Sequence, residues 1–181
     1  MKKITIISLS AITLIIILIF QFGIQIGNVR IGKQVDLKTK QNTNVEQSKF
    51  YATNYSKNEL TVLNLWATWC QPCIEEMPLL NEVKSKYSKE KINFISISVD
   101  NDSIKLVNFN NKGKFKFKDI TIENLKYRNA ILNTLENRTP DKWISSYSVP
   151  VTYFIKNKKV LKKVEGTIEK KELIDIIEKY K

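Results

Sequence analysis

Hydrophobic and polar residues divide the chain into an apolar start, a polar stretch and a long mixed region. Residues 4–26 carry no charged side chain and are dominated by Ile, Leu and Phe. A run of about 23 residues forms a helix of about 34 Å, enough to cross the hydrocarbon core of a bilayer. The end of the run lacks the small residues of a signal-peptide cleavage site. We therefore expect residues 1–27 to be a retained, single-pass membrane anchor.

The remainder divides into a linker and a domain. Residues 28–49 are rich in Gln, Asn, Thr and Lys without a clear period, which predicts a flexible linker. Further on, strand-like alternation and helical spacing follow one another. Strand patterns occupy residues 60–66, 92–99, 115–122, 151–156 and 160–165, and helical patterns occupy residues 72–87, 103–110, 124–136 and 168–180. The expected fold over residues 50–181 is α/β, with a central mixed sheet of about five strands flanked by helices.

The residue inventory excludes several kinds of chemistry. The chain has no His and only two Cys. It cannot assemble a Ser-His-Asp triad, a Cys-His nucleophile or an ordinary zinc site, so we expect no metal. The formal net charge of +12 suits either nucleic acid or a surface of anionic lipid. The apolar start of the chain favours the lipid surface, and we expect no nucleic-acid partner.

The two cysteines stand in a Cys70-Gln71-Pro72-Cys73 motif between a predicted buried strand and a predicted helix. There a thiol meets unpaired backbone N–H groups and the positive end of the helix dipole, which stabilise the nucleophilic thiolate. Cys73 follows one turn later, close enough to form a disulfide with Cys70. Half of a zinc site is an alternative that lacks further ligands, and a purely structural disulfide closing so short a loop would stabilise little. Thiol–disulfide exchange is the favoured chemistry.

Two segments resemble a known family. Residues 66–78, W-A-T-W-C-Q-P-C-I-E-E-M-P, look like the active-site strand and helix of the thioredoxin superfamily, and more narrowly of the bacterial TlpA/ResA-like membrane-tethered oxidoreductases. Residues 148–155, S-V-P-V-T-Y-F-I, match a second family motif, in which the proline is cis and faces the cysteines across the substrate groove. The resemblance is strong over residues 59–100 and 147–181 and weak between them. It implies a thioredoxin-like fold.

The resemblance also implies roles for individual residues. Cys70 and Cys73 would form a redox-active disulfide and carry the catalysis. Glu76, one turn after Cys73, would help to move its proton; alternatively, it is a solvated acid favoured by the helix dipole. At Asn64 thioredoxin has a buried Asp that assists proton transfer, so that role is vacant in this chain. The implied residues of the substrate groove are Trp69, Gln71, Pro72, Val149 and Pro150.

The implied function is the reduction of protein disulfides outside the cytoplasm. Cys70 would attack a substrate disulfide, and Cys73 would resolve the mixed disulfide. Electrons would come from an integral-membrane thiol carrier rather than from a soluble cofactor, and apocytochrome c maturation is one family use. Residues 4–26 would hold the catalytic domain at the extracytoplasmic, periplasmic side of the cytoplasmic membrane.

Two alternative functions stay open. A thiol oxidase or disulfide isomerase would use the same fold and motif at a less reducing potential. A non-catalytic thioredoxin-like binding module would use the fold without its thiols. Residues 101–146 also exceed what a minimal thioredoxin domain needs, and they form either a partner-recognition insertion or additional packing.

Overall fold

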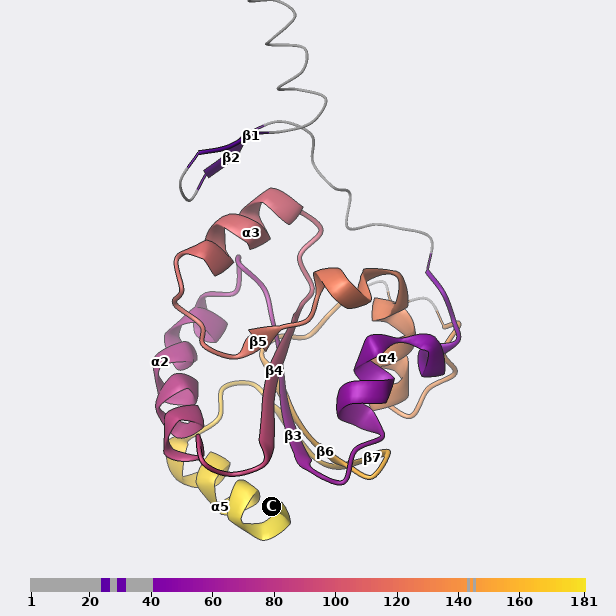
Figure 1. Cartoon of the computed structure of the whole chain (residues 1–181), viewed down its shortest axis with the longest axis vertical. Helices are drawn as coiled ribbons and strands as arrows, with labels where there is room; N and C mark the ends of the chain where they lie inside the picture. Colours follow the sequence, from indigo (N-terminus) through magenta and orange to yellow (C-terminus); the bar gives the residue numbers. More distant parts are fainter. Residues whose placement is uncertain (1–23, 27–28, 32–40, 143, 145) are drawn as a thin grey trace, which may run out of the picture.

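A five-stranded mixed sheet forms the centre of the molecule, with helices on both faces (Figure 1). The computed structural model describes residues 24–26, 29–31, 41–142, 144 and 146–181. The strand order is β5-β4-β3-β6-β7, which confirms the predicted α/β class and the mixed sheet. The strands are β3 (Leu60–Trp66), β4 (Ile92–Ser98), β5 (Lys118–Asp119), β6 (Val151–Lys156) and β7 (Lys159–Glu165).

The central strand β3 runs parallel to β4 and antiparallel to β6. All of its residues are buried, as expected for a continuous apolar run covered on both faces of a sheet. Side chains alternate between the two faces. Leu63 and Leu65 belong to one buried cluster, whereas Leu60 and Val62 belong to the other.

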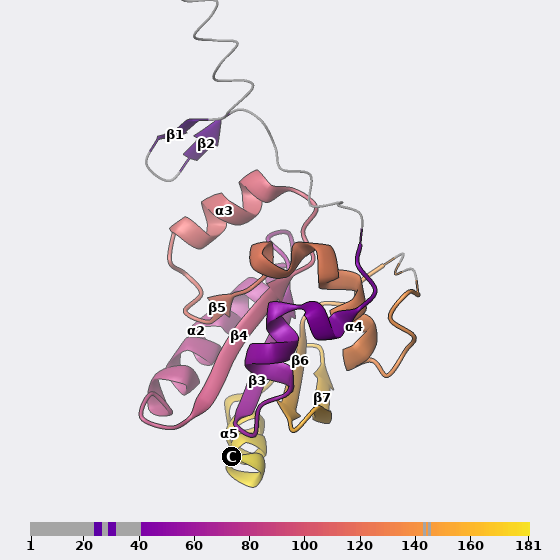
Figure 2. The same cartoon turned by 45° about the vertical axis from the view of Figure 1, so that its right-hand side comes forward.

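Helices α2 (Gln71–Lys86) and α5 (Lys170–Tyr180) cover one face of the sheet and lie side by side in both views (Figures 1 and 2). Their inward positions recur at helical spacing, as the sequence predicts. They pack on Val62 and Phe154 through Leu80, Val83, Leu173 and Ile177. Only residues 67–70 separate the end of β3 from the start of α2.

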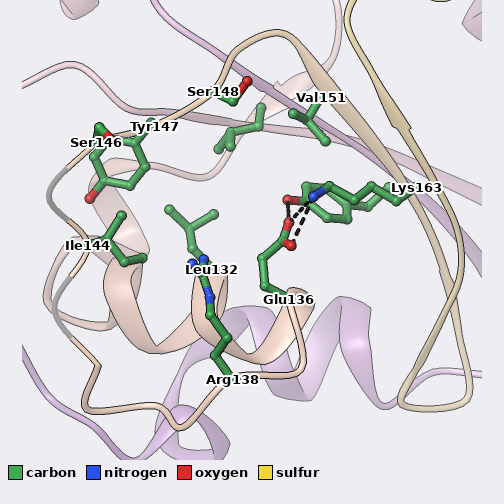
Figure 3. Close-up of a pocket in the computed structure, with 11 residues that line it drawn as sticks. Leu132, Glu136, Arg138, Ile144, Ser146, Tyr147, Ser148, Val151 and Lys163 are labelled. Atoms are coloured by element: carbon green, nitrogen blue, oxygen red, sulfur yellow. Dashed lines mark hydrogen bonds and ion pairs between the residues drawn. The ribbon is translucent and has the colours of Figure 1, made fainter.

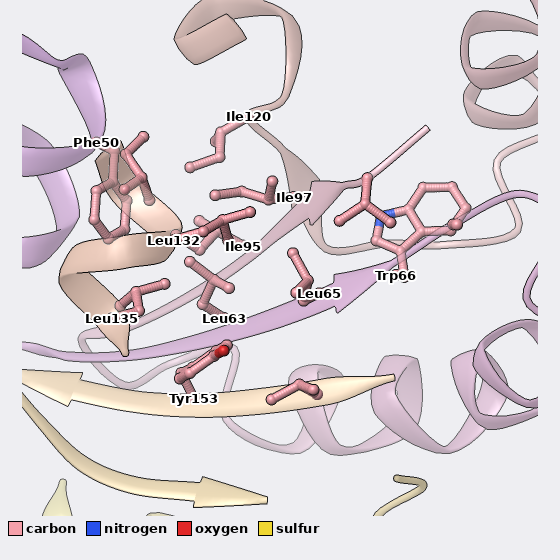
Figure 4. Close-up of a cluster of buried hydrophobic side chains, with 14 of the residues drawn as sticks. Phe50, Leu63, Leu65, Trp66, Ile95, Ile97, Ile120, Leu132, Leu135 and Tyr153 are labelled. Carbon is pink, nitrogen blue, oxygen red and sulfur yellow. The ribbon is translucent and has the colours of Figure 1, made fainter. Parts of the chain in front are cut away.

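The other face is covered by the helical turn η2 (Tyr51–Tyr55) and by α4 (Arg128–Leu135). The side chains between these elements and the sheet form a second buried cluster (Figure 4). Phe50, which directly precedes η2, is completely buried in it. Labelled members of the cluster from the sheet and from α4 include Leu63, Leu65, Ile95, Ile97, Leu132, Leu135 and Tyr153.

The alternation over residues 115–122 predicts a full strand, but β5 contains only Lys118 and Asp119. The preceding backbone is engaged by a side chain of α2 instead of a neighbouring strand. Asn81 donates to the Lys114 carbonyl at 2.8 Å and accepts from the Lys116 N–H at 2.7 Å. These two hydrogen bonds replace a strand ladder, which sequence alternation cannot reveal.

Residues 101–146 contain α3 (Ser103–Asn111), a 3₁₀ helix η3 (Ile122–Tyr127) and α4. The sequence predicts one helix over 124–136, whereas the structure has two helices that meet at Tyr127, whose backbone leaves helical geometry. The Asn124 side chain explains the tight first part, because it donates to the Ile120 carbonyl and accepts from the Phe50 N–H. Tertiary hydrogen bonds therefore set this boundary.

The predicted linker, residues 28–49, needs correction at its end. Asn42 donates its backbone N–H to the Lys126 carbonyl at 2.5 Å. A short 3₁₀ helix η1 (Val45–Gln47) follows, capped by the side chain of Asn44. Val45 and Ser48 are buried. The packed domain therefore begins before residue 50, and its polar residues serve as caps and hydrogen-bond donors.

Most of the predicted anchor lies outside the described residues. Ile24–Ile26 forms a short strand β1 that pairs antiparallel with β2 (Val29–Ile31). The predicted helical run therefore does not extend through residue 26. Within the part of the chain that the structure describes, no helix has the length and apolar character needed to span a bilayer.

Candidate active site

The two cysteines form a disulfide at the junction of β3 and α2, with an S–S distance of 2.02 Å. Cys70 is the N-cap residue of α2, and its Sγ accepts a hydrogen bond from the Cys73 N–H at 3.3 Å. Pro72 stands in the first turn, where a helix needs no hydrogen bond from its nitrogen. Cys70 is 4% exposed and Cys73 is 1% exposed. The sulfur of Cys70 therefore meets the electropositive end of the helix, and Cys73 lies behind it.

The predicted groove residues differ in exposure and in their place in the fold. Trp69 is 65% exposed, the largest exposed fraction among the large hydrophobic side chains described. Gln71 is exposed and donates to Glu75 at 2.9 Å, one turn along the helix. The Val149–Pro150 peptide bond is cis, as the family resemblance implies. Since Val151 pairs with Leu65 in the sheet, Pro150 lies at the edge where β3 leads into the cysteine loop.

Glu76, one turn of α2 after Cys73, is buried, with only 6% of its surface exposed. Its Oε1 accepts from Asn64 Nδ2 at 3.1 Å, and its Oε2 accepts from the Ile168 N–H at 3.2 Å. The same Asn64 amide donates to the Thr152 hydroxyl at 3.2 Å. Burial raises the pKa of Glu76, and the two hydrogen bonds oppose this shift only in part. A solvated acid is therefore excluded, and Glu76 is suited to holding a proton.

A second buried carboxylate, absent from the sequence predictions, holds the loop before Cys70. Asp100 is 2% exposed and accepts from the Thr68 N–H at 2.8 Å and from the Thr68 hydroxyl at 2.7 Å. The Ser98 hydroxyl donates to it at 2.5 Å, and Arg128 donates to its backbone carbonyl at 2.7 Å. The sequence did contain a signal for this role: Asp100 directly follows a predicted buried strand, at the same sheet edge as Cys70.

A pocket of about 250 Å³ opens beside the segment that leads to Pro150 (Figure 3). Glu136 in its wall forms a 2.7 Å ion pair with Lys163 and also accepts from the Tyr153 hydroxyl. Burial favours the neutral acid, but these hydrogen bonds hold the pKa of Glu136 below its usual value. Burial and the bond to Glu136 raise the pKa of Tyr153. No sequence motif marks this cluster, because its members come from three separate elements.

The fold has counterparts among solved structures. A thiol:disulfide interchange protein of the thioredoxin family from Chlorobium tepidum aligns with a TM-score of 0.54 at 19% identity, covering 68% of this chain and 81% of that chain. StoA from Bacillus subtilis aligns with a TM-score of 0.50 at 14% identity, covering 66% of this chain and 82% of that one. At such low identity these likenesses show the fold alone, which is thioredoxin-like.

Sequence comparison adds closer relatives. A thiol-disulfide oxidoreductase ResA from Bacillus cereus is 31% identical over 127 residues, covering 68% of this chain and 64% of that protein. ResA from Geobacillus thermodenitrificans is 29% identical over 123 residues, covering 66% and 62%. ResA from Bacillus thuringiensis is 39% identical over 61 residues, covering 34% and 35%. The chain thus matches less than two thirds of the length of these relatives.

The sequence similarity to a known family covers most of the sheet as well as the cysteine motif. The profile of the AhpC/TSA family matches residues 31–164, which include β3 to β6 and nearly all of β7. Together with the thioredoxin-like fold and the ResA relatives, this match shows that the chain belongs to the AhpC/TSA family.

Proposed function

We propose that this chain is a thiol–disulfide oxidoreductase that reduces protein disulfides through Cys70 and Cys73. The observation that carries the proposal is the position of Cys70 Sγ at the N-cap of α2, where it accepts from the Cys73 N–H at 3.3 Å. A helix N-terminus stabilises a thiolate, which is the species that attacks a disulfide. The ResA relatives are thiol-disulfide oxidoreductases, which supports the same chemistry.

The reaction begins from the dithiol form. The Cys70 thiolate attacks one sulfur of the substrate disulfide, forms a mixed disulfide and releases the other substrate sulfur as a thiolate that takes up a proton. Cys73 then loses its proton and attacks Cys70 Sγ, which releases the second substrate thiol. The pair is left as the disulfide seen in the structure. Two electrons pass from the protein to the substrate; one of the two protons taken up by the substrate thiols comes from Cys73, and the other comes from the solvent that received the Cys70 proton.

Glu76 is proposed as the group that accepts the Cys73 proton in the second step. It follows Cys73 by one turn of α2, and it is buried with a raised pKa. Its hydrogen-bond partners are the neutral Asn64 amide and a backbone N–H. A carboxylate in such surroundings gains a proton readily, since burial disfavours its charged form.

The cellular setting is part of the proposal. The apolar start of the chain would anchor it in the cytoplasmic membrane, and the catalytic domain would lie on the extracytoplasmic side. An integral-membrane thiol carrier would return electrons to the Cys70–Cys73 disulfide, and apocytochromes are one class of substrate. The groove for the substrate would comprise Trp69, Gln71, Pro72, Val149 and Pro150. The uncharged run at the start of the sequence supports this topology.

The reduction potential of the Cys70–Cys73 pair tests the direction of electron flow. The full-length chain in detergent would be equilibrated with graded dithiothreitol buffers and the dithiol fraction measured. A potential near or below that of thioredoxin, about −270 mV, is expected of a reductant. A value between about −120 and −180 mV would instead identify an oxidase or isomerase.

The Cys70→Ser variant tests whether the domain is an enzyme at all. Because Cys70 is the proposed nucleophile, reduction of a protein disulfide by the variant should fall to the uncatalysed rate. The Cys73→Ser variant is the matched control, and it should accumulate the mixed disulfide between Cys70 and the substrate. Full function of Cys70→Ser in the cell would favour the binding-module alternative.

A further inference from the structure

The pocket of about 250 Å³ adjoins the proposed substrate groove on the face of the sheet that α4 covers (Figure 3). Ser146, Tyr147 and Ser148 line it immediately before the Val149–Pro150 peptide, and Val151 lines it immediately after. Val151 pairs with Leu65, which also lines the pocket and lies five residues before Cys70. A polypeptide whose disulfide reaches Cys70 would therefore bring its neighbouring residues to the mouth of this pocket.

Of the three charged residues in the pocket wall, Glu136 and Lys163 form an ion pair with each other. Glu136 binds Lys163 at 2.7 Å and accepts from the Tyr153 hydroxyl. Lys163 forms a second ion pair, with Glu165, at 2.6 Å. Lys163 is thus shared between two carboxylates, and both Glu136 and Lys163 have their ion-pair partners within the protein.

Arg138 is the exception. Figure 3 shows its side chain directed into the pocket, beside Leu132. Within the described part of the chain, no hydrogen bond or ion pair engages its guanidinium group, while its backbone N–H is bonded to the Asn133 carbonyl. The positive charge of Arg138 acts through space on Glu136, but its guanidinium N–H groups have no hydrogen-bond acceptor in the described part of the pocket wall. Hydrogen bonds from a guanidinium group match the two oxygens of a carboxylate, so these N–H groups select an anionic partner.

We propose that this pocket is a subsite for an acidic side chain of the substrate polypeptide, close to its cystine, and that Arg138 is the residue that recognises it. The methylene groups of the ligand would contact Leu132 and Val151, and its carboxylate would meet the guanidinium group. The hydroxyl group of Ser146 provides a further hydrogen-bond donor at the pocket wall, whereas the Tyr147 hydroxyl already donates to Asn129 at 3.1 Å. The subsite rests on the proposed function, because it takes its ligand from a polypeptide held at Cys70.

Paired peptides test the subsite with the full-length protein. Each peptide has one cysteine, present as a mixed disulfide with the neutral thiol 2-mercaptoethanol. Each also carries Glu, or Gln as its match, at one of the two positions before or after the cysteine. We expect the Glu peptide of the best pair to be reduced with a kcat/KM about three- to tenfold higher, a modest ratio because Arg138 is exposed. This ratio should shrink at high salt.

Two variants separate recognition from overall charge. Arg138→Gln should bring the Glu-to-Gln ratio close to one. Lys162→Gln, which removes an exposed positive charge from β7 outside the pocket lining, should leave the ratio unchanged. Equal rates for both peptides with the wild-type protein, or a ratio that survives Arg138→Gln, would overturn the subsite.

Two further measurements distinguish failure of the subsite from failure of the proposed function. Bis(2-hydroxyethyl) disulfide is small and uncharged, so wild type and Lys162→Gln should reduce it equally; no reduction by either of them would refute the oxidoreductase. Binding of peptides with Ser in place of Cys, followed by NMR titration, reports the Glu-to-Gln preference without thiol chemistry. A preference that depends on Arg138 supports the subsite, and its absence refutes it.

Discussion

Two buried carboxylates flank the cysteine pair, and they are held in different ways. Glu76 lies behind Cys73 and accepts from the Asn64 amide and the Ile168 N–H. Asp100 lies beside the loop that leads to Cys70. It accepts from the backbone N–H and the hydroxyl of Thr68 and from the hydroxyl of Ser98.

The difference lies in the neighbouring charges. Among the residues that the structure describes, no ion pair involves Glu76, and burial raises its pKa. Asp100 has Arg128 next to it, bonded to its backbone carbonyl at 2.7 Å, and the carboxylate attracts this guanidinium group. A buried acid without a cation favours its protonated form, whereas an acid with three donors and a cation acts as a fixed acceptor. Glu76 therefore suits proton transfer, and Asp100 suits the positioning of the cysteine loop.

Removing the fixed acceptor should have the largest effect on stability. Asp100→Ala leaves the Thr68 N–H and two hydroxyl groups without their partner and takes the carboxylate away from Arg128. The free energy of unfolding of the oxidised protein, measured with urea, should fall by about 3 kcal/mol.

Asp102 provides the matched control. Its side chain caps α3 through the N–H groups of Ile104 and Lys105 at 2.9 and 3.1 Å. Asp102→Ala should therefore cost about 1 kcal/mol, the usual loss for an N-cap. An Asp100→Ala variant no less stable than Asp102→Ala would refute the positioning role of Asp100.

Glu76→Gln should act on the reaction more than on the fold. Loss of the proton acceptor should slow the resolution of the mixed disulfide by roughly 100-fold, as measured by rapid quench in a single turnover. In the wild-type protein this rate should rise with pH through the raised pKa of Glu76 and then level off; the variant should lack that inflection. Glu75→Gln changes an exposed acid on the same helix and should leave rate and profile unaltered. Equal effects at both positions would refute the role of Glu76.

The free energy of unfolding should also depend on the ionisation of Glu76, and the direction of this pH dependence can be stated. The unfolded chain releases the Glu76 proton near pH 4.3, whereas burial makes the folded chain retain it to higher pH. Between these two pKa values the folded state holds more protons, so its stability falls as pH rises. Subtracting the wild-type curve from that of Glu76→Gln should give a difference that increases through this window in favour of the variant. A flat difference would mean that Glu76 has no raised pKa.

The smallest loss of stability is expected when a single hydroxyl group, that of Thr68, is removed. Thr68→Val removes the 2.7 Å hydrogen bond to Asp100 and keeps the bond from the Thr68 N–H. The loss should be about 1 kcal/mol in urea unfolding. Thr53→Val removes an exposed hydroxyl that donates to Lys49 and should cost almost nothing. A loss at Thr68 as large as that of Asp100→Ala would show that the hydroxyl, rather than the N–H, carries the interaction.

Strong local patterns made part of this molecule predictable. β3 and β6 have the predicted bounds, because an apolar run between polar turns marks a buried strand. The N-cap position of Cys70 follows from a strand that ends just before a proline-containing helix start. Residues close in sequence determine both the bounds of these strands and the N-cap position of Cys70. The placement of the groove residues and the transmembrane anchor stay predictions.

Other features depended on partners far along the chain. Residues 115–122 alternate like a strand, yet the Asn81 side chain of α2 bonds to the backbone of Lys114 and Lys116, and the strand starts only at Lys118. The packed start of the domain before residue 50 depends on Lys126, 84 residues after Asn42. A sequence pattern records periodicity within one segment, and it cannot show which distant group completes a hydrogen bond.

The sequence by itself determined the α/β class, the position of the cysteine pair at a strand–helix junction and the exclusion of His-based chemistry. Only the tertiary structure decided the environment of the carboxylates. Glu76 is buried, and its carboxylate accepts from the Ile168 N–H, 92 residues away. Asp100 holds the cysteine loop because the Thr68 N–H, 32 residues earlier in the chain, donates to it. The chemistry of a carboxylate depends on its burial and its neighbours, which the folded chain alone brings together.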